Sequence, residues 1–177
     1  LGQKSDKALG LQKGEEVDLN SSTVTLAQSF KFASRVLNPF VVPRMFLRPS
    51  ASHGLLPYPY SNPPASVCGA ALTSERGFSI QDIAFVTARH MAYYRGEHFV
   101  RTMRSSAQEL KMILLAGLRL AQLGVPDPQV DAEAKLLATK VDPPQLEALR
   151  AAAKLFVEAG AKVDVKQWLQ SVELTAC

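Results

Sequence analysis

The chain has few cysteines, no long apolar run and none of the common catalytic signatures. Cys68 and Cys177 are the only cysteines in 177 residues. Two cysteines are too few for a disulfide framework, and they lack Cys-x-x-Cys spacing, so two reduced thiols are expected. No run of about 18 apolar residues occurs, which argues against a membrane span. Gly-x-Ser-x-Gly, phosphate-cradling glycine loops and dinucleotide fingerprints are also missing, so nucleophilic catalysis and nucleotide binding have no support.

The composition is that of a globular protein, with 47% hydrophobic and 20% charged residues. This length suits one core, or one domain with a partly independent helical extension. Residues 1–20 are polar and lack an apolar period, so we expect a linker or the end of an upstream region there. The chain begins with Leu1 and has no leader, and we expect a fragment whose single domain, residues 21–177, is truncated at its end. The expected compartment is the cytoplasm.

Short strands follow a first helix and indicate an α+β fold. Apolar residues at helical spacing predict a helix from Thr23 to Leu37. Three strand candidates come next, at residues 41–47, 54–58 and 66–72. Six prolines between residues 43 and 64 interrupt central pairing, so we expect a small antiparallel sheet with exposed edges.

The second half of the chain is predicted to be helical, because capping residues precede each apolar stretch. Ser79 with Asp82 and Ser106 with Glu109 resemble capping boxes. Asp-Pro pairs at 127–128 and 142–143 place an N-cap before a proline at the first helical position. Asp164 with Gln167 begins a last helix through Trp168, Val172 and Ala176. The segments share no residue pattern, so a helical repeat adaptor is an alternative rather than the preferred fold.

Basic residues between positions 89 and 119 form a local excess of positive charge, in a chain of net charge +4. They outnumber the two acidic residues there, Glu97 and Glu109, and comprise Arg89, Arg95, Arg101, Arg104, Lys111 and Arg119. A positive surface attracts phosphate, but no nucleic-acid-binding motif accompanies these residues. A solvated basic face is therefore preferred, and a nucleic-acid-binding module stays an alternative.

The stretch Arg89-His90-Met91-Ala92-Tyr93 has the spacing of an H-E-x-x-H metallopeptidase motif but not its chemistry. Two imidazoles one helical turn apart hold zinc in that motif, and the glutamate between them activates water. Here Arg89 and Tyr93 stand at the two ligand positions and His90 at the glutamate position. A fixed cation repels zinc, and an un-ionised phenol is a poor ligand, so the reaction is not expected.

The end of the chain supplies a second motif, Glu173 to Cys177, and with it a family resemblance. Together the two motifs resemble a degenerate gluzincin domain of the CAAX-prenyl-endopeptidase-like kind. In that family Glu-x-x-x-Asp provides the third zinc ligand and its partner, so Glu173 matches the ligand, Ala176 the small residue and Cys177 the aspartate. Tyr93-Tyr94-Arg95-Gly96-Glu97-His98 also resembles peptidase-like domains attached to bacterial tetratricopeptide-repeat proteins. The resemblance implies a gluzincin-like fold.

The departures from the family pattern imply a catalytically inactive domain that acts in protein interaction or as a scaffold. No metal and no cofactor are expected. We hypothesise that Arg89 forms an ion pair with Glu173, in place of a link through the metal. The expected partner is a protein or peptide, bound in an extended form beside a strand of the retained groove. Partner identity and oligomeric state stay open.

Besides the helical adaptor and the nucleic-acid-binding module, a third alternative competes with this interpretation. A metal-dependent hydrolase with an altered ligand set would use His90, Glu173 and a residue that the sequence does not identify. His98 is a poor candidate, because two helical turns place it about 12 Å from His90. His53 lies in a loop rich in proline, serine and glycine, and its distance from the others cannot be inferred. Tyr58 and Tyr60 are expected to cover the small core rather than to bind a peptide.

Overall fold

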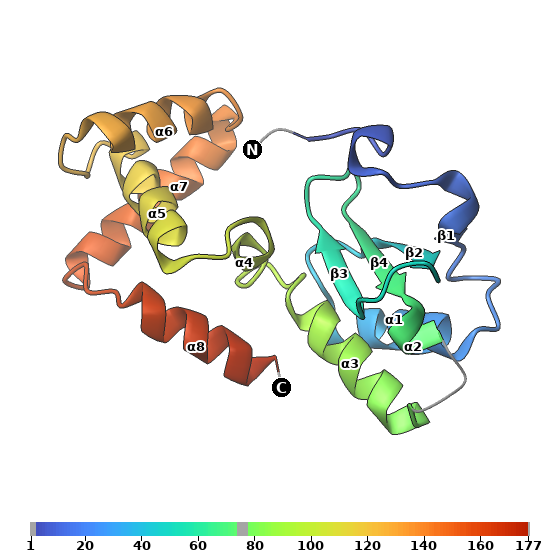
Figure 1. The fold of residues 1–177 in the computed structure, drawn as a ribbon. Coiled ribbons are helices and arrows are strands. Elements are labelled where there is room, and N and C mark those ends of the chain that lie inside the picture. Colours follow the sequence, from blue (N-terminus) through green and yellow to red (C-terminus); the bar gives the residue numbers. More distant parts are fainter. Residues whose placement is uncertain (1–2, 74–77, 177) are drawn as a thin grey trace. The chain divides into compact units, whose positions relative to one another are not determined.

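The computed structural model describes residues 3–73 and 78–176, and its helices and strands are labelled in Figure 1. Two compact units divide the chain. The sheet unit comprises the described residues of Gly2–Met103 and Val172–Cys177, and the helical unit comprises Arg104–Ser171. The boundary falls inside the last helix, α8 (Val165–Thr175). The single domain expected over residues 21–177 spans parts of both units.

The sheet is mixed rather than antiparallel. Its strands are β1 (Glu16–Val17), β2 (Arg44–Arg48), β3 (Leu55–Tyr58) and β4 (Ala65–Gly69), in the order β1-β2-β4-β3. β1 and β3 pair antiparallel with β2 and β4, but β2 and β4 run parallel. The expected α+β class is confirmed. The fully antiparallel sheet is wrong, because β3 lies on the outer side of β4 and leaves β2 beside β4. The presence of a sheet also contradicts the purely helical adaptor.

Two apolar clusters cover the two faces of this sheet. Alternate residues of β4 point to opposite faces. Cys68 packs with helices α1 (Thr25–Leu37) and α3 (Ile80–Ala92), where Phe30 and Met91 are fully buried. Val67 packs with Phe46 and Leu11 on the other face. The helix predicted from Thr23 to Leu37 is thus confirmed, and its apolar stripe faces the core.

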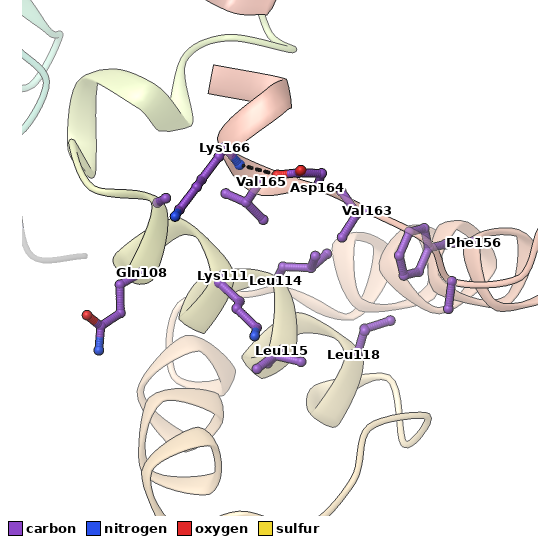
Figure 2. A pocket seen from close by; sticks show the side chains of 12 residues that line it. Gln108, Lys111, Leu114, Leu115, Leu118, Phe156, Val163, Asp164, Val165 and Lys166 are labelled. Carbon is purple, nitrogen blue, oxygen red and sulfur yellow. Dashed lines mark hydrogen bonds between the residues drawn. The ribbon is translucent and has the colours of Figure 1, made fainter. Parts of the chain in front are cut away.

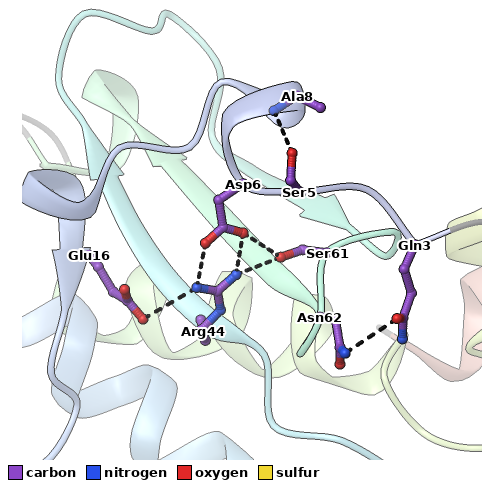
Figure 3. A network of polar contacts seen from close by, with 8 residues as sticks. All are labelled: Gln3, Ser5, Asp6, Ala8, Glu16, Arg44, Ser61 and Asn62. Atoms are coloured by element: carbon purple, nitrogen blue, oxygen red, sulfur yellow. Dashed lines mark hydrogen bonds and ion pairs between the residues drawn. The ribbon is translucent and has the colours of Figure 1, made fainter.

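The N-terminal segment is part of the fold, which corrects the expected linker. Figure 3 shows the Asp6 carboxylate against the Arg44 guanidinium, with oxygen–nitrogen distances of 2.6 and 2.9 Å. Glu15 forms a second paired contact with Arg48 at 2.7 to 3.1 Å. These hydrogen bonds lower the pKa of both carboxyls. The segment reads as polar because its chief attachments are arginine–carboxylate pairs, whose partners lie far away in the sequence.

Capping boxes begin α3 and two helices of the helical unit, and those at Ser79 and Ser106 were predicted. Ser79 Oγ accepts from the Asp82 N–H, and the Asp82 carboxylate accepts from the Ser79 N–H. In the helical unit, α5 (Ala107–Leu120) and α7 (Pro143–Glu158) begin with equivalent boxes, at Ser106–Glu109 and Asp142–Gln145. Asp127 caps α6 (Pro128–Ala138) and Asp164 caps α8. Within the described ranges, every helix is too short or too polar to cross a lipid bilayer.

Candidate functional site

The last turn of α3 presents Arg89 and Tyr93 toward the same carboxylate. Tyr93 is the C-cap residue of α3 and lies four positions after Arg89, so the two side chains occupy one face of the helix. Arg89 Nη2 lies 3.1 Å from Glu173 Oε2, and the Tyr93 hydroxyl donates to the same oxygen at 2.5 Å. All three residues belong to the sheet unit. The hypothesised contact between Arg89 and Glu173 is confirmed.

A second arginine completes this cluster, and the sequence did not reveal it. Arg101, in the short helix α4 (Val100–Met103), places Nη2 at 3.3 Å from Glu173 Oε1. One carboxylate therefore serves two guanidinium groups and a phenol. We call these four residues, Arg89, Tyr93, Arg101 and Glu173, the Glu173 cluster. The sequence signal for Arg101 was only its place in the basic stretch.

The contacts in the Glu173 cluster favour the ionised carboxylate. The hydrogen bond from Tyr93, followed by that from Arg89 and by the charges of both arginines, lowers the pKa of Glu173. Partial burial raises the pKa of Tyr93, and the nearby Glu173 carboxylate raises it further. The phenol therefore keeps its proton at neutral pH and acts as a hydrogen-bond donor.

His90 points away from this cluster and into the core of the sheet unit. Its Nε2 lies 2.7 Å from Ser66 Oγ on β4, which in turn lies 3.0 Å from the Tyr94 hydroxyl. Tyr94 donates to the Ala65 carbonyl at 2.9 Å, so its oxygen accepts from Ser66 and leaves the Ser66 oxygen to accept from the His90 Nε2–H. In this series of hydrogen bonds each proton is donated once. Burial lowers the pKa of His90 to about 4, so the imidazole is neutral at pH 7.

Zinc does not fit the residues that stand at the motif positions. The two arginines lie 3.1 and 3.3 Å from Glu173, the one matching carboxylate. Fixed positive charge at that range opposes a divalent cation. His90 Nε2 is engaged with Ser66. Searching the described ranges finds no group of three histidine, cysteine or acidic side chains able to hold a metal ion. Cys177, expected at the aspartate position, lies outside the described residues.

A pocket of about 220 Å³ lies beside the Glu173 cluster. Strand β3, helices α3 and α4, and the end of α8 all contribute to it. Its lining consists of Leu55, Pro57, His90, Tyr93, Arg101, Thr102 and Glu173, all from the sheet unit. We call it the β3 pocket. The pocket is therefore lined both by edge strand β3 and by the motif residues His90, Tyr93 and Glu173.

The remaining histidines and the described cysteine have structural surroundings. His98 lies beyond the end of α3, is buried, and makes a 3.0 Å contact from Nδ1 to the Ala92 carbonyl. α3 ends at Ala92, so His98 does not share a helix with His90. His53 Nδ1 lies 3.0 Å from the Gly54 carbonyl. Burial raises the pKa of Cys68 to about 12, which keeps it a thiol rather than a reactive thiolate.

Each arginine of the basic stretch contacts a carboxylate. In the sheet unit, Arg95 pairs with Glu97 at 2.7 Å, besides the pairs at Glu173. In the helical unit, Arg119 lies 2.5 Å from Asp131, and Arg104 lies within 4.0 Å of two glutamates. Arginines held by carboxylates have less free charge to offer phosphates. These pairs disfavour the nucleic-acid-binding alternative.

The helical unit has a larger and more apolar pocket of about 670 Å³, shown in Figure 2. Leucines of α5, among them Leu114 and Leu118, line it together with Phe156 and Val163. Lys111 and Lys166 stand among these apolar side chains. Lys111 belongs to the basic stretch, and Asp164 is the N-cap of α8. The pocket has no recognisable catalytic group.

Searches of family models, curated proteins and solved structures find no match to this chain. The gluzincin resemblance therefore stays a prediction from two motifs. The contact between Arg89 and Glu173 agrees with it, because the resemblance was the reason to expect those two residues together.

Proposed function

We propose that this chain is a catalytically inactive, metallopeptidase-like interaction domain that binds an extended peptide along β3. The Glu173 cluster is the observation that carries the proposal. A glutamate at the position of a zinc ligand is held by two arginines and a tyrosine. Those contacts link α3, α4 and the end of α8, which is the structural task that a metal performs in an active enzyme.

The outer edge of β3 supports the binding part of the proposal. The Gly69 N–H donates to the Gly54 carbonyl at 3.0 Å, and the register places these two residues opposite each other. Antiparallel pairing alternates, so Leu55 and Pro57 turn their backbone groups away from β4. The free edge thus offers the Leu55 N–H and the carbonyls of Leu55 and Pro57. Pro57 lacks a backbone N–H, which is tolerated because the residue lies on an edge strand.

Restoring the metal ligands tests the family assignment. Because Arg89 and Tyr93 both reach Glu173 Oε2, the double substitution Arg89→His/Tyr93→His places two imidazoles around that carboxylate. We expect the purified double variant, without a polyhistidine tag, to bind one zinc ion, measured by calorimetry and elemental analysis. Adding Glu173→Gln should abolish that binding. No zinc uptake by the folded double variant would show that the motif positions do not form a metallopeptidase site.

The wild-type chain provides the test of inactivity. We expect protein purified without added zinc to carry no stoichiometric metal and to leave a mixture of unstructured peptides uncleaved. Tightly held metal that is lost with Glu173→Gln would favour the rival function, a metal-dependent hydrolase with an altered ligand set.

Strand addition has its own signature in the backbone of the ligand. A peptide paired antiparallel with Leu55 and Pro57 uses only every second amide toward β3. A nine-residue peptide that binds the chain is first selected from a random display library. We therefore expect N-methylation of its backbone amides to abolish binding at alternate positions and to be tolerated between them. Fluorescence anisotropy measures each affinity. Equal tolerance at all positions would rule out pairing with β3, whatever the metal analysis gives.

A further inference from the structure

The core of the helical unit is incompletely filled. Its buried side chains are mostly alanines, such as Ala116 and Ala134. The larger side chains of Leu114, Leu118 and Phe156 instead line two adjoining pockets of about 670 and 460 Å³, which we call the lysine pocket and the leucine pocket. Packed cores leave few voids larger than a water molecule, whereas small-molecule sites have volumes of about 300 to 1,000 Å³.

The chemistry of the two pockets changes from one to the other. Apolar residues alone line the leucine pocket, and they come from α5, α6 and α7 and from the segment after α6. The lysine pocket shares Leu114, Leu118 and Phe156 with it and adds Lys111 and Lys166. Figure 2 shows the two lysines on one side of the lysine pocket and Leu118 and Phe156 on the other. A molecule with an apolar tail and a polar head at one end matches this order.

The charges of the lysine pocket favour an anionic head. Lys111, Lys166 and Asp164 are its charged lining residues, which gives a formal excess of one positive charge. In the part of the chain that the structure describes, neither lysine forms an ion pair. Asp164 Oδ1 accepts from the N–H groups of Lys166 and Gln167 at 2.9 and 3.1 Å, at the start of α8. Both lysines are exposed, so a carboxylate reaches their ammonium groups from solvent.

We propose that the helical unit binds a fatty acid, with its tail in the leucine pocket and its carboxylate beside Lys111 and Lys166. A helix of a partner protein fits less well, because a groove for a helix has polar rims along its length. Here the polar lining residues all belong to the lysine pocket. Both pockets lie within the helical unit, so the proposal is independent of strand addition at β3.

A series of saturated fatty acids, from octanoic to tetradecanoic acid, tests the apolar half of the site. Each acid is added to the full chain below its micelle concentration, and isothermal titration calorimetry measures stoichiometry and affinity. We expect one ligand per chain and a gain of about tenfold for each added pair of buried CH₂ groups, until the leucine pocket is full. Absence of binding, or affinity independent of chain length, would overturn the proposal.

Filling the wall that the two pockets share locates the tail. Leu118→Trp should weaken dodecanoic acid by about tenfold, because the indole excludes about two CH₂ groups. Leu136→Trp is the matched control, since Leu136 is 63% exposed and lines neither pocket. Circular dichroism confirms that each variant is folded. If Leu118→Trp disrupts the fold, Val163→Asp places a charge at a lining residue that is 49% exposed and should also weaken binding. Unchanged affinity in a folded variant would contradict the proposed site.

The head group is tested with decanoate, decanol and decylamine, which share one tail. We expect decanoate to bind about threefold more tightly than decanol, since exposed ion pairs are weak, and decylamine to bind least tightly. The double substitution Lys111→Gln/Lys166→Gln should remove this order. Lys154→Gln should keep it, because Lys154 is 75% exposed and lies 3.9 Å from Glu158 on α7. The same order in the double variant would show that these lysines do not hold the carboxylate.

Other occupants of the leucines give different results. Analytical ultracentrifugation measures whether the chain associates, and flotation with phosphatidylcholine vesicles measures whether it binds a lipid surface. A stable dimer that takes up no fatty acid would assign the leucines to an interface between two copies. Vesicle binding without binding of the free acid would assign them to a membrane surface. Either result would overturn the proposal.

Discussion

The sheet unit and the helical unit differ in what specifies their structures. In the part of the chain that the structure describes, the large side chains with under 2% exposure, such as Tyr94, Phe30 and Met91, all lie in the sheet unit. The buried residues of the helical unit are mostly small, and Leu136 and Leu155 are 63% and 67% exposed. Each of its helices begins at a well-formed cap instead. Close packing defines one unit, and local capping contributes strongly to the other.

This contrast also explains where the polar chemistry lies. A tightly packed core can hold a hydrogen-bonded chain such as His90–Ser66–Tyr94 in one arrangement, because each member is enclosed by fixed neighbours. The Glu173 cluster sits in the same unit and has its positions fixed by α3 and α4. The helical unit offers apolar pockets, and the side-chain ion pairs described there, such as those of Arg104, are at least partly exposed.

Removing a large core side chain should give the largest effect. Phe30→Ala leaves a cavity under the sheet, and we expect a loss of about 3 to 5 kcal/mol in the free energy of unfolding. Phe32→Ala on the same helix is the control, because Phe32 is 68% exposed and should change stability by under about 0.5 kcal/mol. Urea unfolding followed by circular dichroism measures both. Equal losses would show that α1 does not pack as described.

Hydrogen exchange sharpens the same experiment by resolving the two units. Trp168 is the single tryptophan and lies in the part of α8 that belongs to the helical unit, so its fluorescence reports on that part of the helix. As urea is added, we expect Phe30→Ala to increase amide hydrogen exchange throughout the sheet unit at urea concentrations lower than those that change Trp168 fluorescence. Simultaneous loss of both signals would show that the units unfold together.

Acid should weaken the sheet unit through His90. Burial lowers its pKa from 6.5 to about 4, so the unfolded chain takes up a proton between these values and the folded chain does not. Stability is fully present above pH 6.5 and falls as the pH falls toward 4. This group accounts for about 3 kcal/mol, since one pKa unit is worth about 1.4 kcal/mol. His90→Gln should flatten that slope in urea unfolding, whereas His53→Gln, outside this network, should preserve it.

Much of the secondary structure was readable from the sequence because its signals are local. The capping boxes at Ser79 and Ser106 and the apolar stripe of α1 each lie within one or two helical turns. The parallel pairing of β2 with β4 was missed, because nothing in either strand encodes which neighbour it takes. The N-terminal segment was misread for a similar reason. Asp6 looks like a linker residue until Arg44, 38 positions away, is placed beside it.

The candidate site was partly predictable for a different reason. Arg89 and Glu173 are 84 positions apart, and only a family resemblance gave grounds to pair them. Arg101 and Ser66 carry no comparable signal. Each acquires its role from a fold that brings α4 and β4 beside the groups that the motif names.

Deleting one hydroxyl should show how much the buried polar chain contributes. Ser66→Ala leaves the His90 Nε2–H without its acceptor and the Tyr94 oxygen without its donor. We expect a loss of about 1 to 3 kcal/mol, the cost of leaving a buried polar group unpaired. Ser34→Ala is the control, since Ser34 Oγ donates to the carbonyl of Lys31 in the same helix. A loss no greater than that of the control would mean that water replaces the missing hydroxyl.

Removing a cap should give a smaller effect, confined to the helical unit. Asp142 accepts from the Gln145 N–H at 2.8 Å and begins α7. Asp142→Ala should cost about 1 kcal/mol, and Asp142→Asn should restore most of it because asparagine caps nearly as well. Trp168 fluorescence during urea unfolding follows the unit concerned. If the alanine variant instead raises hydrogen exchange mainly in the sheet unit, then capping does not act on the helical unit alone, and the contrast between the two units fails.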